Sequence, residues 1–185
     1  NAKLIVSSSP HQRGSDTTAS IMRDVLIALI PALLMGTWLF GLRALTMALF
    51  CIVVSILSEL IIQKLTNRPV TIKDYSAAVT GLLLALNLPV GLPFWMAGFG
   101  CIVAIVVVKQ LFGGIGKNFA NPAITARIIM LISFAGPMTT WSVPGADVVT
   151  TATPLAAMAA GQAPPDLPNL FLGLHFGCIG ETSAA

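Results

Sequence analysis

Charge is what this sequence has least of. Only 9% of its 185 residues are charged, whereas a soluble domain carries about a quarter. Hydrophobic residues make up 56% of the chain, and the mean hydropathy is +0.88. A chain with so few charges cannot cover a water-facing surface, so we expect lipid to be the solvent for most of it. The ordinary soluble globular classes are therefore excluded.

The sequence motifs of several functional classes are also missing. No nucleophile–base triad, P-loop or dinucleotide-binding fingerprint is present. The basic residues are scattered among hydrophobic runs and form no stripe with interleaved aromatic residues, which argues against a nucleic-acid-binding surface. The three cysteines form no CxxC pair, and we interpret them as small apolar fillers of helices. We expect no metal site held by this chain alone, although one cysteine donated to an iron site between subunits is an alternative.

Long hydrophobic runs are plentiful, and they predict an all-α fold, a polytopic bundle of transmembrane helices. We expect a cytoplasmic N-terminal arm over 1–23, five complete transmembrane helices within 24–137, a loop over 138–168 and the start of a sixth span over 169–185. The five spans are expected at about 24–42, 44–63, 76–92, 94–112 and 120–137. The sixth run is too short to cross a hydrocarbon core of about 30 Å, so we expect the parent polypeptide to be longer.

The distribution of Lys and Arg predicts the orientation. Cytoplasmic loops of membrane proteins carry an excess of these residues. One set of loops holds Lys3, Arg13, Arg23, Lys64, Arg68, Lys73, Lys109 and Lys117, and the other holds Arg43. We therefore expect a multi-pass protein of the cytoplasmic (inner) membrane, with its N-terminus in the cytoplasm and the 138–168 loop on the extracytoplasmic side.

The predicted outer loop contains an unusual run, DVVTTATPL, at residues 147–155. By itself it is typical of a threonine-rich segment ending in a helix start, with Thr153 as the N-cap and Pro154 at the first helical position. A hydroxyl in that place points into the positive end of a helix dipole, where a phosphate is favoured. The run therefore suits a phosphate ester as well as a plain helix cap.

The same run resembles the Asp-x-x-Ser-Gly-Ala-Thr motif at which flavin mononucleotide (FMN) is esterified through its phosphate to threonine. That motif marks two subunits of the Rnf complex and the related subunits of the sodium-pumping NADH:quinone oxidoreductase. Asp147 matches the motif aspartate, Ala152 the alanine and Thr153 the acceptor threonine. The sequence departs from the motif at Thr150, which replaces serine, and at Thr151, which replaces glycine and offers a competing hydroxyl.

Three further stretches carry the resemblance. Residues 108–123, VKQLFGGIGKNFANPA, resemble a turn of the Rnf D subunit and of its oxidoreductase counterpart, the B subunit. The run SPHQR at 9–13 resembles the N-terminus of the D subunit, and GETS at 180–183 resembles its sixth span. The motifs occur in the family's order over essentially the whole chain. Two details, Lys109-Gln110 and residues 131–134, are more similar to the D subunit than to the B subunit.

The resemblance implies a membrane-embedded flavoprotein subunit of an ion-translocating oxidoreductase. Such a subunit, not catalytic alone, relays electrons in a ferredoxin:NAD oxidoreductase complex coupled to Na⁺ or H⁺ translocation. FMN held covalently through Thr153 is implied, with a second, non-covalent flavin such as riboflavin as a further expectation. Other membrane and peripheral subunits would be the partners. The alternatives are the B subunit of the Na⁺-pumping NADH:quinone oxidoreductase, with a quinone site, and a cofactor-free transporter whose path is lined at helix breaks.

Asn118 and Asn121 are further candidates for cofactor contact. They follow three closely spaced glycines, which allow positive φ and close backbone approach, and they offer amide donors and acceptors beside Pro122. We interpret this turn either as a helix-breaking connection or as a contact to a second flavin or a neighbouring subunit. Arg127 follows within the predicted fifth span. Because a buried Arg is costly in lipid, it should face a partner or a polar cavity, unless it snorkels to the interface.

Two acidic residues within predicted spans are candidates for an ion path. Intramembrane carboxylates are rare and often mark the routes of ions or protons. Glu59 lies near the cytoplasmic end of the second span, where an interfacial position is the alternative. Glu181 lies among small polar residues in the sixth. His175 has no partner in the sequence pattern, and packing or a hydrogen bond to a neighbour explains it more simply than metal or haem ligation.

Overall fold

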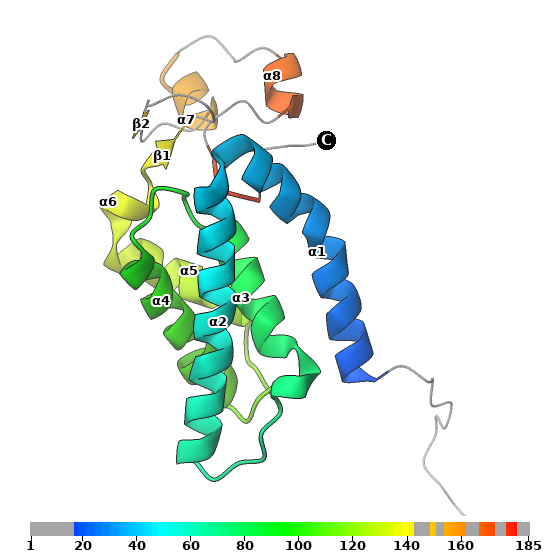
Figure 1. The fold of residues 1–185 in the computed structure, drawn as a ribbon. Coiled ribbons are helices and arrows are strands. Elements are labelled where there is room, and N and C mark those ends of the chain that lie inside the picture. Colours follow the sequence, from blue (N-terminus) through cyan, green and yellow to red (C-terminus); the bar gives the residue numbers. More distant parts are fainter. Residues whose placement is uncertain (1–16, 143–148, 151–153, 162–166, 173–176, 181–185) are drawn as a thin grey trace, which may run out of the picture.

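Helices form most of the protein, as predicted. The computed structural model describes residues 17–142, 149–150, 154–161, 167–172 and 177–180. Its main helices are α1 (Thr18–Phe40), α2 (Leu42–Leu65), α3 (Ser76–Leu86), α4 (Phe94–Ile102), the π-helix η2 (Val103–Gln110) and α5 (Pro122–Ser133). The short elements are η1 (Ile72–Asp74), α6 (Ala135–Met138), β1 (Trp141–Ser142), β2 (Val149–Thr150), α7 (Pro154–Ala159) and α8 (Leu167–Leu172). Figure 1 shows the main helices packed as a bundle with α7 and α8 beyond one end.

Two of the described helices, α1 and α2, are long and apolar enough to cross a membrane. The next candidates are shorter than predicted, because α3 has 11 residues and α5 has 12. At 1.5 Å per residue these two are about 17–18 Å long, well below the roughly 30 Å of a hydrocarbon core. The helical architecture is confirmed, whereas the count of five complete spans stays a prediction.

The start of α1 differs from the predicted boundary near residue 24. Thr17 caps the helix, since its Oγ1 accepts a hydrogen bond from the Ser20 backbone N at 3.2 Å. The Ser20 Oγ accepts from the Thr17 backbone N at 3.0 Å, which completes a capping box. This local chemistry begins the helix at Thr18, inside a segment that composition alone assigned to the polar arm.

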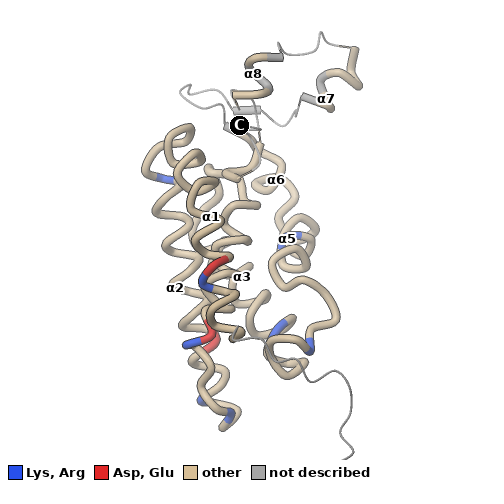
Figure 2. Tube along the Cα trace, turned by 90° about the vertical axis from the view of Figure 1, so that its right-hand side faces the viewer, with Lys and Arg blue, Asp and Glu red and all other residues tan. Residues whose placement is uncertain are grey.

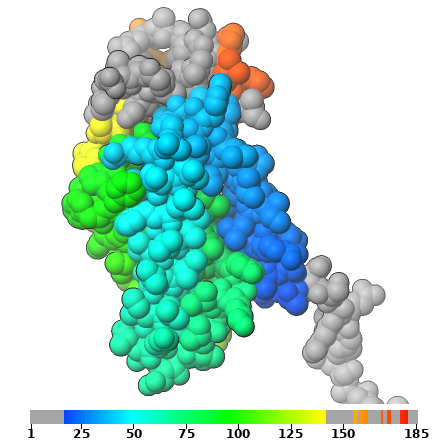
Figure 3. Space-filling view, in the orientation of Figure 1, coloured from blue at the N-terminus to red at the C-terminus, as the bar shows by residue number. Residues whose placement is uncertain are grey.

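The centre of the bundle is the contact between α2 and α3. A side chain on Gly81 of α3 would place its Cβ 2.6 Å from the carbonyl oxygen of Cys51 on α2. The absence of a side chain therefore lets the two backbones meet, as small residues do in membrane helix pairs. By contrast, α1 buries only Gly36 and Leu39. Figure 3 shows α1 and α2 forming one side of the molecule, and α1 carries exposed Leu34 and Trp38.

The predicted third span, 76–92, contains Asn87 and Pro89, which favour a break before its end, and the structure has that break. Helix α3 ends at Leu86, Asn87 is its C-cap, and a turn leads to α4 at Phe94. Arg43 of α2 holds this turn, because its Nε donates to the carbonyl oxygen of Val90 at 2.9 Å. The segment 177–180 lies against the same break, where the backbone N of Gly180 donates to the carbonyl oxygen of Leu86 at 2.8 Å.

The described elements that flank the flavin motif, β2 and α7, lie beyond the end of the bundle opposite the 66–75 loop (Figure 1). Trp141–Ser142 pairs antiparallel with Val149–Thr150, a two-residue ladder within an otherwise helical set of described residues. Helix α7 begins at Pro154, where the sequence predicts a helix start. Figure 2 shows most of the described Lys and Arg positions toward the opposite end of the bundle.

Candidate functional site

A buried ion pair joins α2 to η2. The Lys109 Nζ lies 2.8 Å from the Glu59 Oε1, and the two side chains are 2% and 0% exposed. Burying an unpaired charge is costly in an apolar interior, so the two charges must be neutralised together. Glu59 is therefore a buried residue inside the bundle, and whether it lies at the depth of the membrane interface stays a prediction. Lys109, which the orientation analysis grouped with the loop cations, lies inside the bundle.

The donors around Glu59 converge on one of its two oxygens. Gln110 Nε2 donates to Oε1 at 2.6 Å and Gln63 Nε2 donates to it at 3.3 Å. Gln63 is oriented in turn by Thr71, whose backbone N donates to the Gln63 Oε1 at 3.1 Å. The second carboxylate oxygen, Oε2, is buried and has no hydrogen-bond partner within the described part of the chain. Half of the carboxylate is thus free to accept a further ligand.

Lys109 makes a second contact, to the start of α3. Its Nζ donates to the Ser76 Oγ at 2.6 Å. Ser76 is itself fixed by Asp74, whose Oδ1 accepts from the Ser76 backbone N at 2.9 Å and from its Oγ at 2.5 Å. The Thr80 hydroxyl donates to the Ser76 carbonyl at 2.9 Å. The ammonium is therefore held between a carboxylate on α2 and a serine on α3.

The π-helix explains why Lys109 and Gln110 both point inward. Bonds from Leu111 N to Val106 O and from Gly114 N to Lys109 O each reach back five residues, as in a π turn. Such a turn holds more residues than an α turn, so neighbouring side chains are rotated less around the axis. Val108, Lys109 and Gln110 are consequently all buried. Wide turns of this kind occur often at functional sites.

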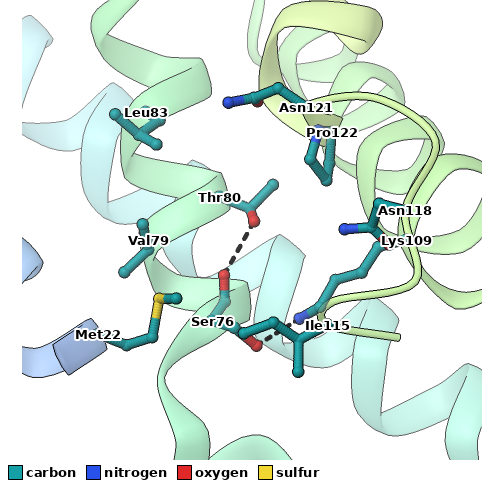
Figure 4. A pocket seen from close by; sticks show the side chains of 10 residues that line it. All are labelled: Met22, Ser76, Val79, Thr80, Leu83, Lys109, Ile115, Asn118, Asn121 and Pro122. Carbon is teal, nitrogen blue, oxygen red and sulfur yellow. Dashed lines mark hydrogen bonds between the residues drawn. The ribbon is translucent and has the colours of Figure 1, made fainter. Parts of the chain in front are cut away.

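A cavity of about 180 Å³ opens on the other side of Lys109 (Figure 4). Its walls come from α1, α3, η2, the glycine turn and the start of α5. The lining residues are Met22, Ser76, Val79, Thr80, Leu83, Lys109, Ile115, Asn118, Asn121 and Pro122. Figure 4 shows Val79 and Leu83 along one wall, with Asn118 and Lys109 across from them. One side of the cavity is apolar and the other carries amides and an ammonium.

The glycine turn has the backbone that the sequence predicts. Gly113, Gly114 and Gly116 have φ angles of 107°, 91° and 79°, which L side chains rarely adopt. The turn brings Asn118 back to η2, where its amide nitrogen, in the orientation that satisfies its neighbours, donates to Lys109 O at 3.3 Å; it also donates to Gly114 O within the turn at 3.0 Å. Asn121 caps α5 by accepting from the backbone N of Ala123 at 3.0 Å. Both asparagines thereby reach the cavity.

Arg127 lies at the break of α3 and does not line the cavity. Its NH1 donates to the Asn87 Oδ1 at 2.7 Å, and its NH2 contacts the Cys178 Sγ at 3.2 Å. The guanidinium therefore faces polar groups within the bundle. These contacts join α5 to the end of α3 and to the 177–180 segment. Its predicted role in flavin contact stays a prediction.

The remaining predicted site residues fall largely outside the described residues. These are Asp147, Thr151, Ala152, Thr153 and Glu181. Thr150 is in β2 and Pro154 opens α7, so the flavin motif is flanked by described structure on both sides. The structure thus brings Glu59 to Lys109, and Asn118 to Asn121. Sequence reasoning missed Ser76, Gln63 and the inward position of Lys109, although a Lys-Gln pair that ends an apolar run was a visible signal.

Comparison with known proteins places the chain in a family. A model described as the NQR2, RnfD, RnfE family matches residues 5–185. The D subunit of the Na(+)-translocating ferredoxin:NAD(+) oxidoreductase complex of Acetobacterium woodii is 50% identical, over 98% of this chain and 58% of its own length. The D subunit of the proton-translocating ferredoxin:NAD(+) oxidoreductase complex of Clostridium ljungdahlii is 39% identical, over 96% and 58%. The D subunit of an ion-translocating oxidoreductase complex of Aliivibrio salmonicida is 44% identical, over 75% and 40%.

The chain therefore spans 58% of the length of the first two of these relatives. Their similarity to this chain extends over nearly all of its residues, including α2 with Glu59, η2 with Lys109 and the glycine turn. The apolar helices agree with a membrane protein. With the family model covering residues 5–185 and a relative 50% identical, the chain belongs to the NQR2, RnfD, RnfE family.

Proposed function

We propose that this chain is part of the D subunit of an ion-translocating ferredoxin:NAD⁺ oxidoreductase complex. In that complex it relays electrons through flavin and forms part of the path of Na⁺ or H⁺, with other membrane and peripheral subunits as partners. The names of its relatives support the assignment to the D subunit. The B subunit of the Na⁺-pumping NADH:quinone oxidoreductase is less favoured, because the relatives compared are D subunits.

The observation that carries the electron-relay role is the DVVTTATPL run at 147–155, with Thr153 as the acceptor of FMN. The described neighbours fit an attached phosphoester. Helix α7 begins at Pro154, and Leu155 is 78% exposed, so the chain beside the acceptor is open to a flavin transferase. Flavin, when bound, supplies the redox chemistry, and the protein supplies its attachment and position.

Mass spectrometry of the loop peptide tests this assignment. In a chain produced with its flavin transferase, we expect the mass of FMN on Thr153. Thr153→Ala abolishes the addition, whereas Thr150→Ala and Thr151→Ala, the matched controls within the motif, retain most of it. A Thr153→Ala chain that still gives a fluorescent band on a denaturing gel contradicts the acceptor. A wild-type chain without any fluorescent band would contradict covalent flavin attachment and favour the alternative of a cofactor-free transporter.

We place a second, non-covalent flavin at the cavity beside Lys109, with only part of its three-ring system inside it. An engineered cavity of about 150 Å³ holds one benzene ring, so this cavity of about 180 Å³ would enclose one ring of a flavin and leave the others at its open side. Val79 and Leu83 would contact one face of a ring system. Asn118 and Asn121 would supply hydrogen bonds to its polar edge. Lys109 would provide a positive charge beside it.

A cavity-filling variant tests the second site. Val79 is 7% exposed and Val79→Phe would fill the cavity, so we expect several-fold less non-covalent flavin released from the denatured complex. Val70→Phe makes the same change at a position that is 52% exposed, and we expect no effect there. Covalent fluorescence at Thr153 reports that each variant chain is intact. An assembled Val79→Phe complex that releases the normal amount of flavin contradicts the site.

Glu59 is the residue we assign to the cation path, with Glu181 as a second candidate. The supporting observation is a fully buried carboxylate whose Oε2 has no partner in the described residues. A buried carboxylate oxygen with a free lone pair suits a dehydrated monovalent cation or a proton, since both need an oxygen ligand. Its position between α2, α3 and η2 puts this carboxylate close to the proposed flavin cavity.

A further inference from the structure

One ammonium group connects the two halves of the candidate site. The Lys109 Nζ contacts the Glu59 Oε1 at 2.8 Å and the Ser76 Oγ at 2.6 Å. The same side chain lines the cavity next to Asn118 (Figure 4). Lys109 therefore separates a buried carboxylate from a space that is large enough to hold a ligand. Any charge that enters on either side acts on this ammonium.

The carboxylate side has unused capacity for a cation. Besides the Glu59 Oε2, the Ser55 Oγ is buried and has no hydrogen-bond partner in the described part of the chain. Residues four apart on a helix lie on the same face, so both oxygens belong to one face of α2. The Ser55 Oγ lies against Gly81 of α3, so the Glu59 Oε2 is the oxygen that a cation beside Lys109 would contact. The positive charge now at Glu59 is the ammonium of Lys109.

We propose that Lys109 is the resident counter-ion of Glu59, and that a translocated monovalent cation replaces it there while the ammonium withdraws toward Ser76 and the cavity. This inference rests on the proposed cation path through Glu59. The exchange conserves charge at the carboxylate, because one cation arrives as another leaves. The ammonium then brings its positive charge to the cavity. A group bound there that has gained one electron carries a negative charge, which would stabilise the ammonium in this position.

The geometry of Lys109 suits such a movement. Its backbone is anchored, because Gly114 N donates to Lys109 O at 3.0 Å. Its side chain is a flexible four-carbon stem with three rotatable donors, and one donor already reaches Ser76. Ser76 is fixed by Asp74, so the second position of the ammonium exists before any cation arrives. In a low-dielectric interior, charges about 4 Å apart interact far more strongly than in water, which links cation occupancy to the charge in the cavity.

The test uses the assembled complex in sealed membrane vesicles. For each variant we would measure ferredoxin-driven NAD reduction against Na⁺ concentration, uptake of radioactive sodium, and proton uptake with a pH-sensitive dye. Lys109→Gln removes the competing charge, so we expect the Na⁺ concentration for half-maximal rate to fall about tenfold or more. Ions moved per electron should fall as well, because no ammonium returns to displace the bound cation. If the complex moves protons, only the dye assay shows uptake, and that uptake per electron falls in the same variant.

A charge-neutral double variant separates function from folding. Glu59→Gln and Lys109→Gln each leave one buried charge unpaired, whereas Glu59→Gln/Lys109→Gln leaves none. We expect the double variant to recover assembly but not ion uptake, and its recovery of both would overturn the inference. Lys117→Gln, the same substitution at an exposed position of the adjoining turn, should behave as wild type.

The outcomes distinguish a failure of Lys109 as the counter-ion from a failure of the proposed cation path through Glu59. Normal ion uptake per electron in Glu59→Gln rejects the path through Glu59. Loss of uptake in Glu59→Gln, together with an unchanged Na⁺ or proton response in Lys109→Gln, keeps that path and rejects Lys109 as its counter-ion.

Discussion

At the scale of single residues, the buried Glu59 and Lys109 and the half-buried Arg127 are each matched to a specific polar or charged group. Glu59 is matched to Lys109, and Arg127 to Asn87. In water such contacts contribute little to stability. In an apolar interior the loss of one partner leaves the other buried and unsatisfied, which is costly. Substitutions at these residues therefore affect stability and function together, and controls must separate the two effects.

Arg127 provides a stability prediction at this scale. Arg127→Met removes the donor to the Asn87 Oδ1 at 2.7 Å and the contact to the Cys178 Sγ at 3.2 Å. We expect a loss of about 1 kcal/mol, the low end of the cost of an unsatisfied acceptor, because Asn87 and Arg127 are half-buried. The measurement is the midpoint of thermal aggregation of the detergent-solubilised chain. Arg23→Met is the control, because Arg23 is 62% exposed and pairs only with Asp24 among the described residues. Equal midpoints for the two variants would mean that Arg127 contributes no more than a surface arginine.

At the scale of helices, the sequence predicts where helices occur better than how long they are. Hydrophobic runs predicted α2 correctly, and Asn87 with Pro89 indicated the break that ends α3. The same runs could not show that α3 and α5 are only 11 and 12 residues long. A turn that contains apolar residues such as Leu88 and Leu92 is as hydrophobic as a helix. These turns are buried by contacts such as that of Arg43 with Val90, and a tertiary contact of this kind leaves no periodic signal.

The inward position of Lys109 was not predictable for a related reason. Counting Lys and Arg treats every cation at the end of a run as a loop residue. Whether such a residue points inward depends on the rotation of the helix. In η2 that rotation is set by π turns, which no composition rule predicts. Asn118 and Asn121 were found because glycines and a helix cap give local signals, whereas Ser76 and Gln63 are recognisable only once α2, α3 and η2 are packed.

Gly81 tests the contact that holds α2 against α3. Gly81→Ala would place a Cβ 2.6 Å from the Cys51 carbonyl oxygen and 2.8 Å from the Ser55 Oγ. The helices must then separate, at a cost of about 1–3 kcal/mol. Gly98→Ala is the matched control, since its Cβ would meet the Phe50 ring at an ordinary 3.5 Å. We expect a lower thermal midpoint for Gly81→Ala than for Gly98→Ala. The reverse order would contradict the close α2–α3 approach.

At the scale of the whole molecule, the structure separates two ends with different chemistry. The elements β2 and α7, which flank the flavin motif, lie with α8 beyond one end, and the 66–75 loop lies at the other (Figure 1). The Glu59–Lys109 pair and the cavity are inside the bundle. An electron carrier on the outer loop and a cation site inside the bundle would therefore be separate in space, so coupling between them requires other groups, such as the proposed second flavin.

Thiol labelling determines which end faces the cytoplasm. The three native cysteines are buried, so the wild-type chain should react little with a membrane-impermeant maleimide. Met158→Cys on α7 and Val70→Cys in the 66–75 loop place new thiols at positions that are 47% and 52% exposed. Because Lys and Arg concentrate in the loops on the Val70 side, we expect intact cells or spheroplasts to label only Met158→Cys. Broken membranes should label both variants, which controls for accessibility. Labelling of Val70→Cys alone in intact cells would invert the topology and place the FMN acceptor in the cytoplasm.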